Sequence, residues 1–261
     1  MKALLVVSFG TSFEGIADRT IGAVERALAA AFPDRALYSA WTSKFICAKV
    51  ERETGVHHMQ MEEACAALIA DGVDDLLVQP TFLMQSHEYA LMFDGLRAGT
   101  GGIARVCVGD TLLACADDCT KLAQALAETF VDMAEDEALV LMGHGSDEGN
   151  EVYAAMQNAC AAAGHGNYIV GTVEGTPDFE DVKAQVDALN PKRLWLAPFM
   201  IVAGDHANND LAGDDSDSWK SVLEAAGYHC VPVLRGLGEY PQVQALFVEH
   251  AHRALAEGQT L

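Results

Sequence analysis

Short apolar runs alternate with longer amphipathic segments along the chain. The runs are continuous, which is typical of strands buried on both faces of a parallel sheet. They predict strands at residues 3–9, 36–41, 75–80, 104–109, 139–143, 168–173, 193–199 and 229–234. The amphipathic segments predict helices at residues 15–31, 44–52, 59–70, 114–134, 150–163, 177–189, 216–226 and 241–256. This alternation predicts an α/β fold with parallel sheets flanked by helices.

The second half of the chain repeats the pattern of the first. Residues 4–15 (LLVVSFGTSFEG) align with residues 138–149 (ALVLMGHGSDEG). Residues 76–84 (LLVQPTFLM) likewise align with residues 194–202 (LWLAPFMIV). Self-similarity of this kind indicates an internal duplication.

The duplication predicts two similar flavodoxin-like halves. The first covers residues 1–134 and the second covers residues 135–261, each with its own parallel sheet. In open α/β sheets, ligands bind outside the carboxyl ends of the strands. We therefore expect a ligand cleft between the halves, faced by both sets of strand ends.

Two histidines stand where the aligned halves differ. Gly10 of the first half aligns with His144 of the second, and Glu88 aligns with His206. Each histidine follows a predicted strand, and His144 lies between two glycines that allow a sharp turn. A scaffold acquires function through residues placed at such strand ends, so the C-terminal half is expected to carry the site.

The charge of the chain argues against several classes of partner. The 261 residues include 38 Asp plus Glu against 16 Lys plus Arg, for a formal net charge of −22. Nucleic acids and anionic membranes require clustered cations, so we expect neither as a partner. The oligomeric state stays open, and a homo-oligomer is among the alternatives.

The apolar segments and the cysteines predict a cytoplasmic protein. No apolar run reaches the roughly 18 residues of a membrane span. Residues 1–10 (MKALLVVSFG) are typical of a buried strand rather than a signal peptide. The seven cysteines have no CxxC or zinc-ribbon spacing, so reduced thiols in a reducing compartment are expected.

His144, Glu174 and His206 form a candidate ligand set for a divalent metal. Glu174 directly follows the predicted strand at 168–173, at the same edge of the sheet as the histidines. Two imidazoles and one carboxylate suit Co²⁺, Ni²⁺, Fe²⁺ or Zn²⁺, and three protein ligands leave positions open for a substrate. Asp205, beside His206, is expected either to orient the imidazole or to cap a helix.

Several of these segments resemble the anaerobic sirohydrochlorin cobaltochelatases, which are class II chelatases related to ferrochelatase. The resemblance covers essentially the whole chain. It rests on residues 4–12 (LLVVSFGTS), 79–89 (QPTFLMQSHEY), 142–146 (MGHGS), 171–175 (GTVEG) and 197–215 (APFMIVAGDHANNDLAGDD). The last segment is the longest and the most specific of the five.

The resemblance implies an activity and the roles of four residues. The activity is insertion of Co²⁺ into sirohydrochlorin with release of two protons, in anaerobic cobalamin biosynthesis, without ATP or an organic cofactor. His144 and His206 match the metal-binding and catalytic histidines of the family, and Glu174 matches its carboxylate ligand. Glu88 matches an acidic residue that helps to bind metal or accepts protons; a first-turn helix acid is the ordinary alternative.

Six side chains near the ends of predicted strands are expected to contact the tetrapyrrole: Ser8, Thr11, Ser12, Phe82, Leu83 and Met84. The three hydroxyl residues would hydrogen-bond its carboxylates. The three apolar residues would pack on the macrocycle face. Core packing is the alternative for these apolar residues, and we expect it for at least one.

Two other functions remain open at this point. The first is a sirohydrochlorin ferrochelatase or nickel chelatase, because this ligand set does not separate the divalent metals. The second is a non-enzymatic, two-lobed binder of metal or tetrapyrrole. A ligand set that leaves coordination positions open disfavours the binder.

Overall fold

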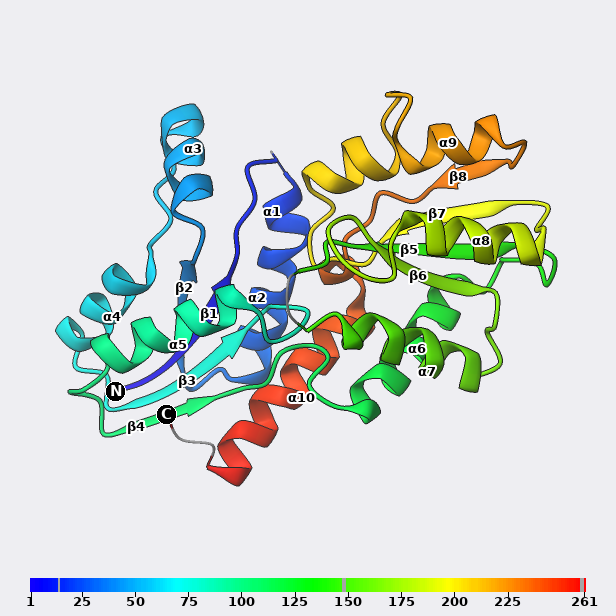
Figure 1. Ribbon diagram of the computed structural model, residues 1–261. Coiled ribbons are helices and arrows are strands. Elements are labelled where there is room, and N and C mark those ends of the chain that lie inside the picture. Colours follow the sequence, from blue (N-terminus) through cyan, green and yellow to red (C-terminus); the bar gives the residue numbers. More distant parts are fainter. Residues whose placement is uncertain (14, 147–148, 259–260) are drawn as a thin grey trace. The chain divides into compact units, whose positions relative to one another are not determined.

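Two four-stranded parallel sheets form the framework of the protein (Figure 1). The computed structural model describes residues 1–13, 15–146, 149–258 and 261. The first sheet contains β1 (Lys2–Ser8), β2 (Ala36–Trp41), β3 (Asp75–Pro80) and β4 (Arg105–Val108), in the order β2-β1-β3-β4. The second contains β5 (Ala138–Gly143), β6 (Tyr168–Thr172), β7 (Leu194–Pro198) and β8 (Cys230–Pro232), in the order β6-β5-β7-β8. The shared, flavodoxin-like order confirms the predicted fold class and agrees with the duplication.

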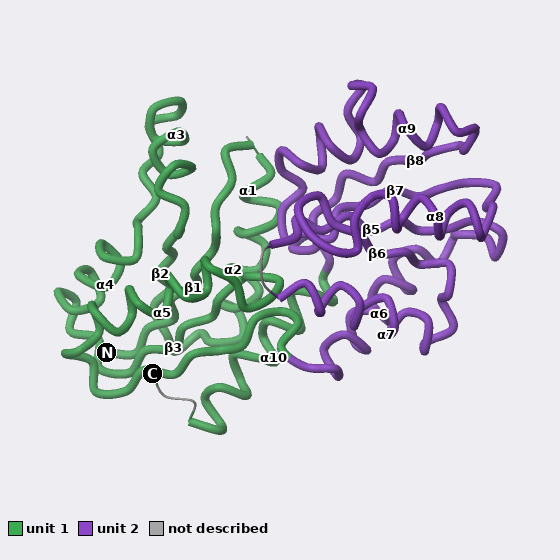
Figure 2. The backbone as a smooth tube through the Cα atoms, in the orientation of Figure 1, with its two compact units in different colours: residues 1–114, 241–261 green, residues 115–240 purple. Residues whose placement is uncertain are grey.

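The first compact unit comprises residues 1–114 and 241–261 (Figure 2). Its helices are α1 (Ile16–Arg19), α2 (Ile21–Ala31), α3 (Lys44–Thr54), α4 (Met61–Ala70), α5 (His87–Gly99) and α10 (Pro241–Glu257). α4 and α5 cover one face of the sheet, where Leu5, Val78 and Leu96 belong to one buried cluster. α2 and α10 pack together on the other face (Figure 1).

The second compact unit comprises residues 115–240. Its helices are α6 (Ala116–Thr129), α7 (Glu151–Ala162), α8 (Phe179–Leu189), the π-helical η1 (Ala207–Leu211), α9 (Trp219–Ala225) and the 3₁₀-helical η2 (Leu237–Glu239). One face of the sheet is covered by α8, η1 and α9, which bury Val182, Leu211 and Leu223 against Val140. α7 contacts β6, and α6 packs beside α7.

The bounds of the two units differ from the predicted halves 1–134 and 135–261. α6 packs with α7 in the second unit, whereas α10 returns to α2, β3 and β4 of the first. Arg253 Nη2 donates to Asp110 Oδ2 at 2.8 Å, and the rings of His252 and Phe32 lie 4.5 Å apart. The order of elements along the chain does not reveal such a return, because an amphipathic helix can cover either sheet.

Three helical segments were not among the predicted elements. The first is α5 (HEYALMFDGLRAG), whose buried residues Met92 and Leu96 lie four apart. The others are η1, a short π-helix, and η2, a three-residue 3₁₀-helix. The helix expected at 15–31 is interrupted at Thr20, whose hydroxyl donates to the Ile16 carbonyl. None of the helices in the described ranges combines the length and apolarity needed to cross a membrane.

The strand registers define which residues of the two units correspond. Ala3 pairs with Leu76 in the first sheet, and Ala138 pairs with Leu194 in the second. Ala3 and Leu76 belong to the cluster under α4 and α5. Ala138 and Leu194 belong to the equivalent cluster under α8 and α9. Ala3 therefore corresponds to Ala138, one residue away from the alignment that placed residue 4 over residue 138.

Candidate metal centre

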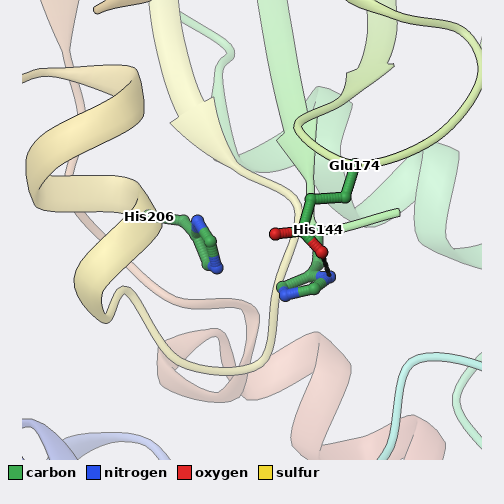
Figure 3. Close-up of side chains that lie close together, drawn as sticks. All are labelled: His144, Glu174 and His206. Carbon is green, nitrogen blue, oxygen red and sulfur yellow. Dashed lines mark ion pairs between the residues drawn. The ribbon is translucent and has the colours of Figure 1, made fainter. Parts of the chain in front are cut away.

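His144, Glu174 and His206 lie together beyond the carboxyl ends of β5, β6 and β7 (Figure 3). One ligand atom from each side chain lies within 4.8 Å of the other two. The two imidazole rings are perpendicular, with centroids 4.6 Å apart, and His144 Nδ1 is 3.9 Å from Glu174 Oε2. Among the described residues, this is the one group of three or more His, Cys, Asp or Glu side chains gathered closely enough to hold a metal ion.

The backbone beyond β5 and β6 places His144 beside Glu174. The Val173 N–H donates to the Gly143 carbonyl at 3.1 Å, and the Glu174 N–H donates to the His144 carbonyl at 2.8 Å. These bonds continue the pairing of the two strands past their ends. His144 and Glu174, the two candidate ligands, are therefore fixed by main-chain hydrogen bonds and not by side-chain packing alone.

Gly145 allows this close approach. Its φ is +84°, in the left-handed region, and a Cβ added there would lie 2.7 Å from both the Glu174 carbonyl carbon and the Gly175 nitrogen. The Gly145 N–H donates to the Tyr153 hydroxyl of α7 at 3.1 Å. Glycine is needed at this position both for the backbone conformation and for the space.

Both imidazoles have an acceptor at Nδ1. His144 Nδ1 is 2.8 Å from the Gly145 carbonyl, and His206 Nδ1 is 2.7 Å from Asp210 Oδ2. An Nδ1–H donated to these oxygens leaves the lone pair of each Nε2 available to a metal. Asp205, for which orienting His206 was one of two alternatives, instead accepts a hydrogen bond from Asn209 Nδ2 at 2.9 Å, so Asp210 and not Asp205 is the acid at the His206 ring.

The three side chains are accessible to an incoming metal. The exposed fractions are 49% for the His144 side chain, 61% for Glu174 and 29% for His206. Two buried cysteines of the unit, Cys160 and Cys230, are unsuited to compete for the metal. Burial raises the pKa of the Cys160 and Cys230 thiols to about 12, so both remain protonated at neutral pH.

Glu88, the fourth predicted residue of the centre, belongs to the first unit. It lies in the first turn of α5 and is half-buried. Its Oε2 atom is buried and has no hydrogen-bond partner among the described residues. His87 beside it is exposed.

The predicted tetrapyrrole contacts also belong to the first unit, and most are buried. They are Ser8, Thr11, Phe82 and Met84, which are buried, and Ser12 and Leu83, which are half-buried. The Ser8 hydroxyl is 2.7 Å from the Thr81 hydroxyl, and Thr11 Oγ1 accepts from the Phe13 N–H at 3.2 Å. Phe82 packs in the cluster under α4 and α5, which is the ordinary core role weighed for this residue.

The first unit has a different residue at each position of the metal centre. The corresponding residues are Phe9 for His144, Ser43 for Glu174 and Glu88 for His206. The backbone supports this assignment, because the Ser43 N–H donates to the Phe9 carbonyl just as the Glu174 N–H donates to that of His144. The alignment of Gly10 with His144 was thus wrong by one residue. Gly10 corresponds to Gly145, and both have positive φ.

Comparison with known proteins assigns the chain to a family. The family model described as Cobalt chelatase (CbiK) matches residues 2–256. The chain belongs to the CbiK cobalt chelatase family. The sirohydrochlorin cobaltochelatase of Salmonella typhimurium is 38% identical over 258 residues, which cover 97% of this chain and 96% of that protein. The sirohydrochlorin cobaltochelatase CbiKC of Nitratidesulfovibrio vulgaris is 33% identical over 186 residues, covering 69% of this chain and 64% of that protein.

Solved structures share the fold of this CbiK-family chain. SirB from Bacillus subtilis with Fe³⁺ has a TM-score of 0.68 at 15% identity, covering 99% of this chain and 98% of that one. The sirohydrochlorin chelatase SirB from Bacillus subtilis subspecies spizizenii in complex with cobalt has a TM-score of 0.66 at 14% identity, with the same coverage. At such low identity these likenesses establish the fold alone.

Proposed function

We propose that this chain is a sirohydrochlorin cobaltochelatase, which inserts Co²⁺ into sirohydrochlorin in cobalamin biosynthesis. The observation that carries the proposal is the cluster of His144, Glu174 and His206 in a chain of the CbiK family. Imidazole and carboxylate ligands suit Co²⁺, the substrate metal. Three protein ligands leave coordination positions that the ring nitrogens of a tetrapyrrole can fill.

The proposed reaction exchanges one divalent cation for two pyrrole protons. We propose that it proceeds without ATP or an organic cofactor, as the resemblance to the anaerobic cobaltochelatases implies. The Nε2 atoms of His144 and His206 and the Glu174 carboxylate would hold the metal while it loses water. A neutral imidazole or a carboxylate that releases the metal can accept a proton.

We propose Glu88 as a further acid–base residue of the reaction. Its support is the Oε2 atom, which is buried without a hydrogen-bond partner among the described residues and so retains its capacity to accept a proton. For the macrocycle we propose contacts at the carboxyl edge of the first sheet. Ser12 and Leu83 are the half-buried members of that set, and the buried Ser8, Thr11, Phe82 and Met84 support the loops around them.

We propose a cytoplasmic setting, supported by the cysteines and the net charge of the chain. All seven cysteines are free, which supports a reducing, cytoplasmic compartment. The net charge of −22 disfavours nucleic acid and anionic membranes as partners. Fe²⁺, Ni²⁺ and Zn²⁺ suit the same ligands, so we propose that metal supply in the cell contributes to the choice.

An absorbance assay of metal insertion tests this function. We expect the purified chain to accelerate formation of Co-sirohydrochlorin, with Fe²⁺, Ni²⁺ and Zn²⁺ measured in parallel. His144→Ala and His206→Ala should each lower the rate by more than the roughly 10–100-fold typical of losing an outer-shell partner, because each removes a direct ligand. His229→Ala is the control, since His229 is an exposed histidine at the amino edge of the same sheet.

Two outcomes would contradict the proposal in different ways. If the wild-type chain gives no acceleration with any of the four metals, the enzymatic function is wrong, and a binder becomes the better description. If the wild type is active but either ligand variant keeps the wild-type rate at limiting Co²⁺, the assigned metal centre is wrong.

A further inference from the structure

Asp210 contacts His206 at Nδ1, the ring nitrogen that is not proposed to bind the metal. Its Oδ2 lies 2.7 Å from His206 Nδ1, and the side chains are 44% and 29% exposed, respectively. The two residues are four apart in the sequence PFMIVAGDHANND. The distance is that of a charge-assisted hydrogen bond, which is shorter and stronger than a neutral one.

The π-helix η1 gives Asp210 this position. In the first unit, Glu88 corresponds to His206. The residue four positions after Glu88 is Met92, an α5 residue that is fully buried in the core cluster of that unit. In the second unit the fully buried residue is Leu211, five positions after His206. A π-helical turn accommodates one residue more than an α-helical turn. The extra residue allows Leu211 to enter the core while Asp210 stays beside the imidazole.

The segment that carries the pair is fixed at several points. Ala207 and Leu211, which follow His206 and Asp210 in the chain, are both fully buried. Asn208 Nδ2 donates to the Ala203 and Gly204 carbonyls at 3.2 and 2.7 Å. The backbone that presents His206 and Asp210 is therefore held in place independently of any metal.

We propose that Asp210 is a positioning residue, which accepts the Nδ1–H of His206 and thereby directs the Nε2 lone pair toward the metal. This inference rests on the proposed function, because it assumes that His206 binds Co²⁺. His144 is oriented differently, since its Nδ1 contacts the Gly145 main-chain carbonyl. Asp210 is therefore the side chain through which the tautomer of one ligand can be altered without removing the ligand.

Three variants test this role. Asp210→Ala removes the acceptor. Asp210→Asn keeps an oxygen that can accept the Nδ1–H but removes the charge. Asp205→Ala is the matched control, because Asp205 is the acid next to His206 that contacts Asn209 instead. Each variant is compared with the wild type and with His206→Ala by thermal unfolding, by Co²⁺ titration of the metal-free chain, and by ¹H–¹⁵N spectra that report which ring nitrogen carries the proton.

We expect Asp210→Ala to weaken Co²⁺ affinity by about 10–100-fold and to abolish the preference of His206 for the Nδ1–H form. Asp210→Asn should keep the Nδ1–H form and recover most of the affinity. Asp205→Ala should match the wild type. None of the three substitutions removes a buried apolar side chain, so unfolding temperatures should stay close to that of the wild type.

Failure of this inference can be distinguished from failure of the metal centre. If His206→Ala binds Co²⁺ as tightly as the wild type, the proposed centre itself is wrong. If His206→Ala loses affinity but Asp210→Ala does not, only the role of Asp210 is contradicted. The role is equally contradicted if Asp210→Asn falls as far as Asp210→Ala, or if Asp205→Ala falls as far as either.

Discussion

At the scale of single residues, the metal centre depends on a backbone that passes very close to a neighbouring strand end. Gly145 follows His144 directly, and its Cα faces the peptide between Glu174 and Gly175. Residue types and their place after strands were enough to predict that His144, Glu174 and His206 lie together at one edge of the sheet. The contact of Asp210 with His206 was not predicted, because it depends on the π-helix η1, which no pattern of apolar residues indicates. The four-residue spacing from His206 was the available clue.

Gly145→Ala should damage the centre more than the backbone conformation alone would explain. Gly164→Ala is the matched control, because Gly164 has a similar φ of +92° but nothing within 4 Å of an added Cβ. The control should cost about 1–2 kcal/mol of unfolding free energy, the usual strain of a left-handed residue. Gly145→Ala adds the clash at 2.7 Å, so it should cost more and also weaken Co²⁺ binding. Denaturant unfolding and Co²⁺ titration check both effects, and equal losses in the two variants would contradict this explanation.

At the scale of elements, the sequence predicted all eight strands near their observed positions, because buried parallel strands are continuous apolar runs. It missed α5, in which Met92 and Leu96 are the buried residues among several apolar ones, and η1, which has an unusual geometry. The alignment of the two halves was wrong by one residue at β1 and β5, since runs of similar apolar residues align almost equally well in either register. The strand registers removed the ambiguity and showed that Phe9 of the first unit corresponds to His144 of the second.

Because α10 packs in the first unit, truncating its core side chain should destabilise that unit and not the second. Phe247 in α10 is fully buried, and Leu223 in α9 is fully buried in the second unit. Truncation to alanine should cost about 3–5 kcal/mol for Phe247 and 2–5 kcal/mol for Leu223. We expect Phe247→Ala to lower hydrogen-exchange protection in β3 and β4, and Leu223→Ala to lower it in β5 and β7. Loss of protection mainly in β5 and β7 in the Phe247 variant would contradict the assignment of α10.

At the scale of the whole molecule, the duplicated α/β scaffold gathers a candidate set of metal ligands in one of its two copies, as far as the described residues show. The second unit has two imidazoles and a carboxylate where the first has Phe9, Ser43 and Glu88. The fold class and the family could be predicted from the sequence because they depend on strand pattern and on local motifs. The bounds of the units could not, because they depend on which sheet each amphipathic helix covers.

The metal centre is tested most directly by locating Co²⁺ in the wild-type chain. Crystals soaked with Co²⁺ and measured at the cobalt absorption edge would place the ion by its anomalous scattering. We expect one strong peak about 2.0–2.2 Å from Nε2 of both His144 and His206, with a Glu174 carboxylate oxygen at a similar distance. A strong peak elsewhere with none among these three side chains, or coordination through either Nδ1 atom, would contradict the proposed centre.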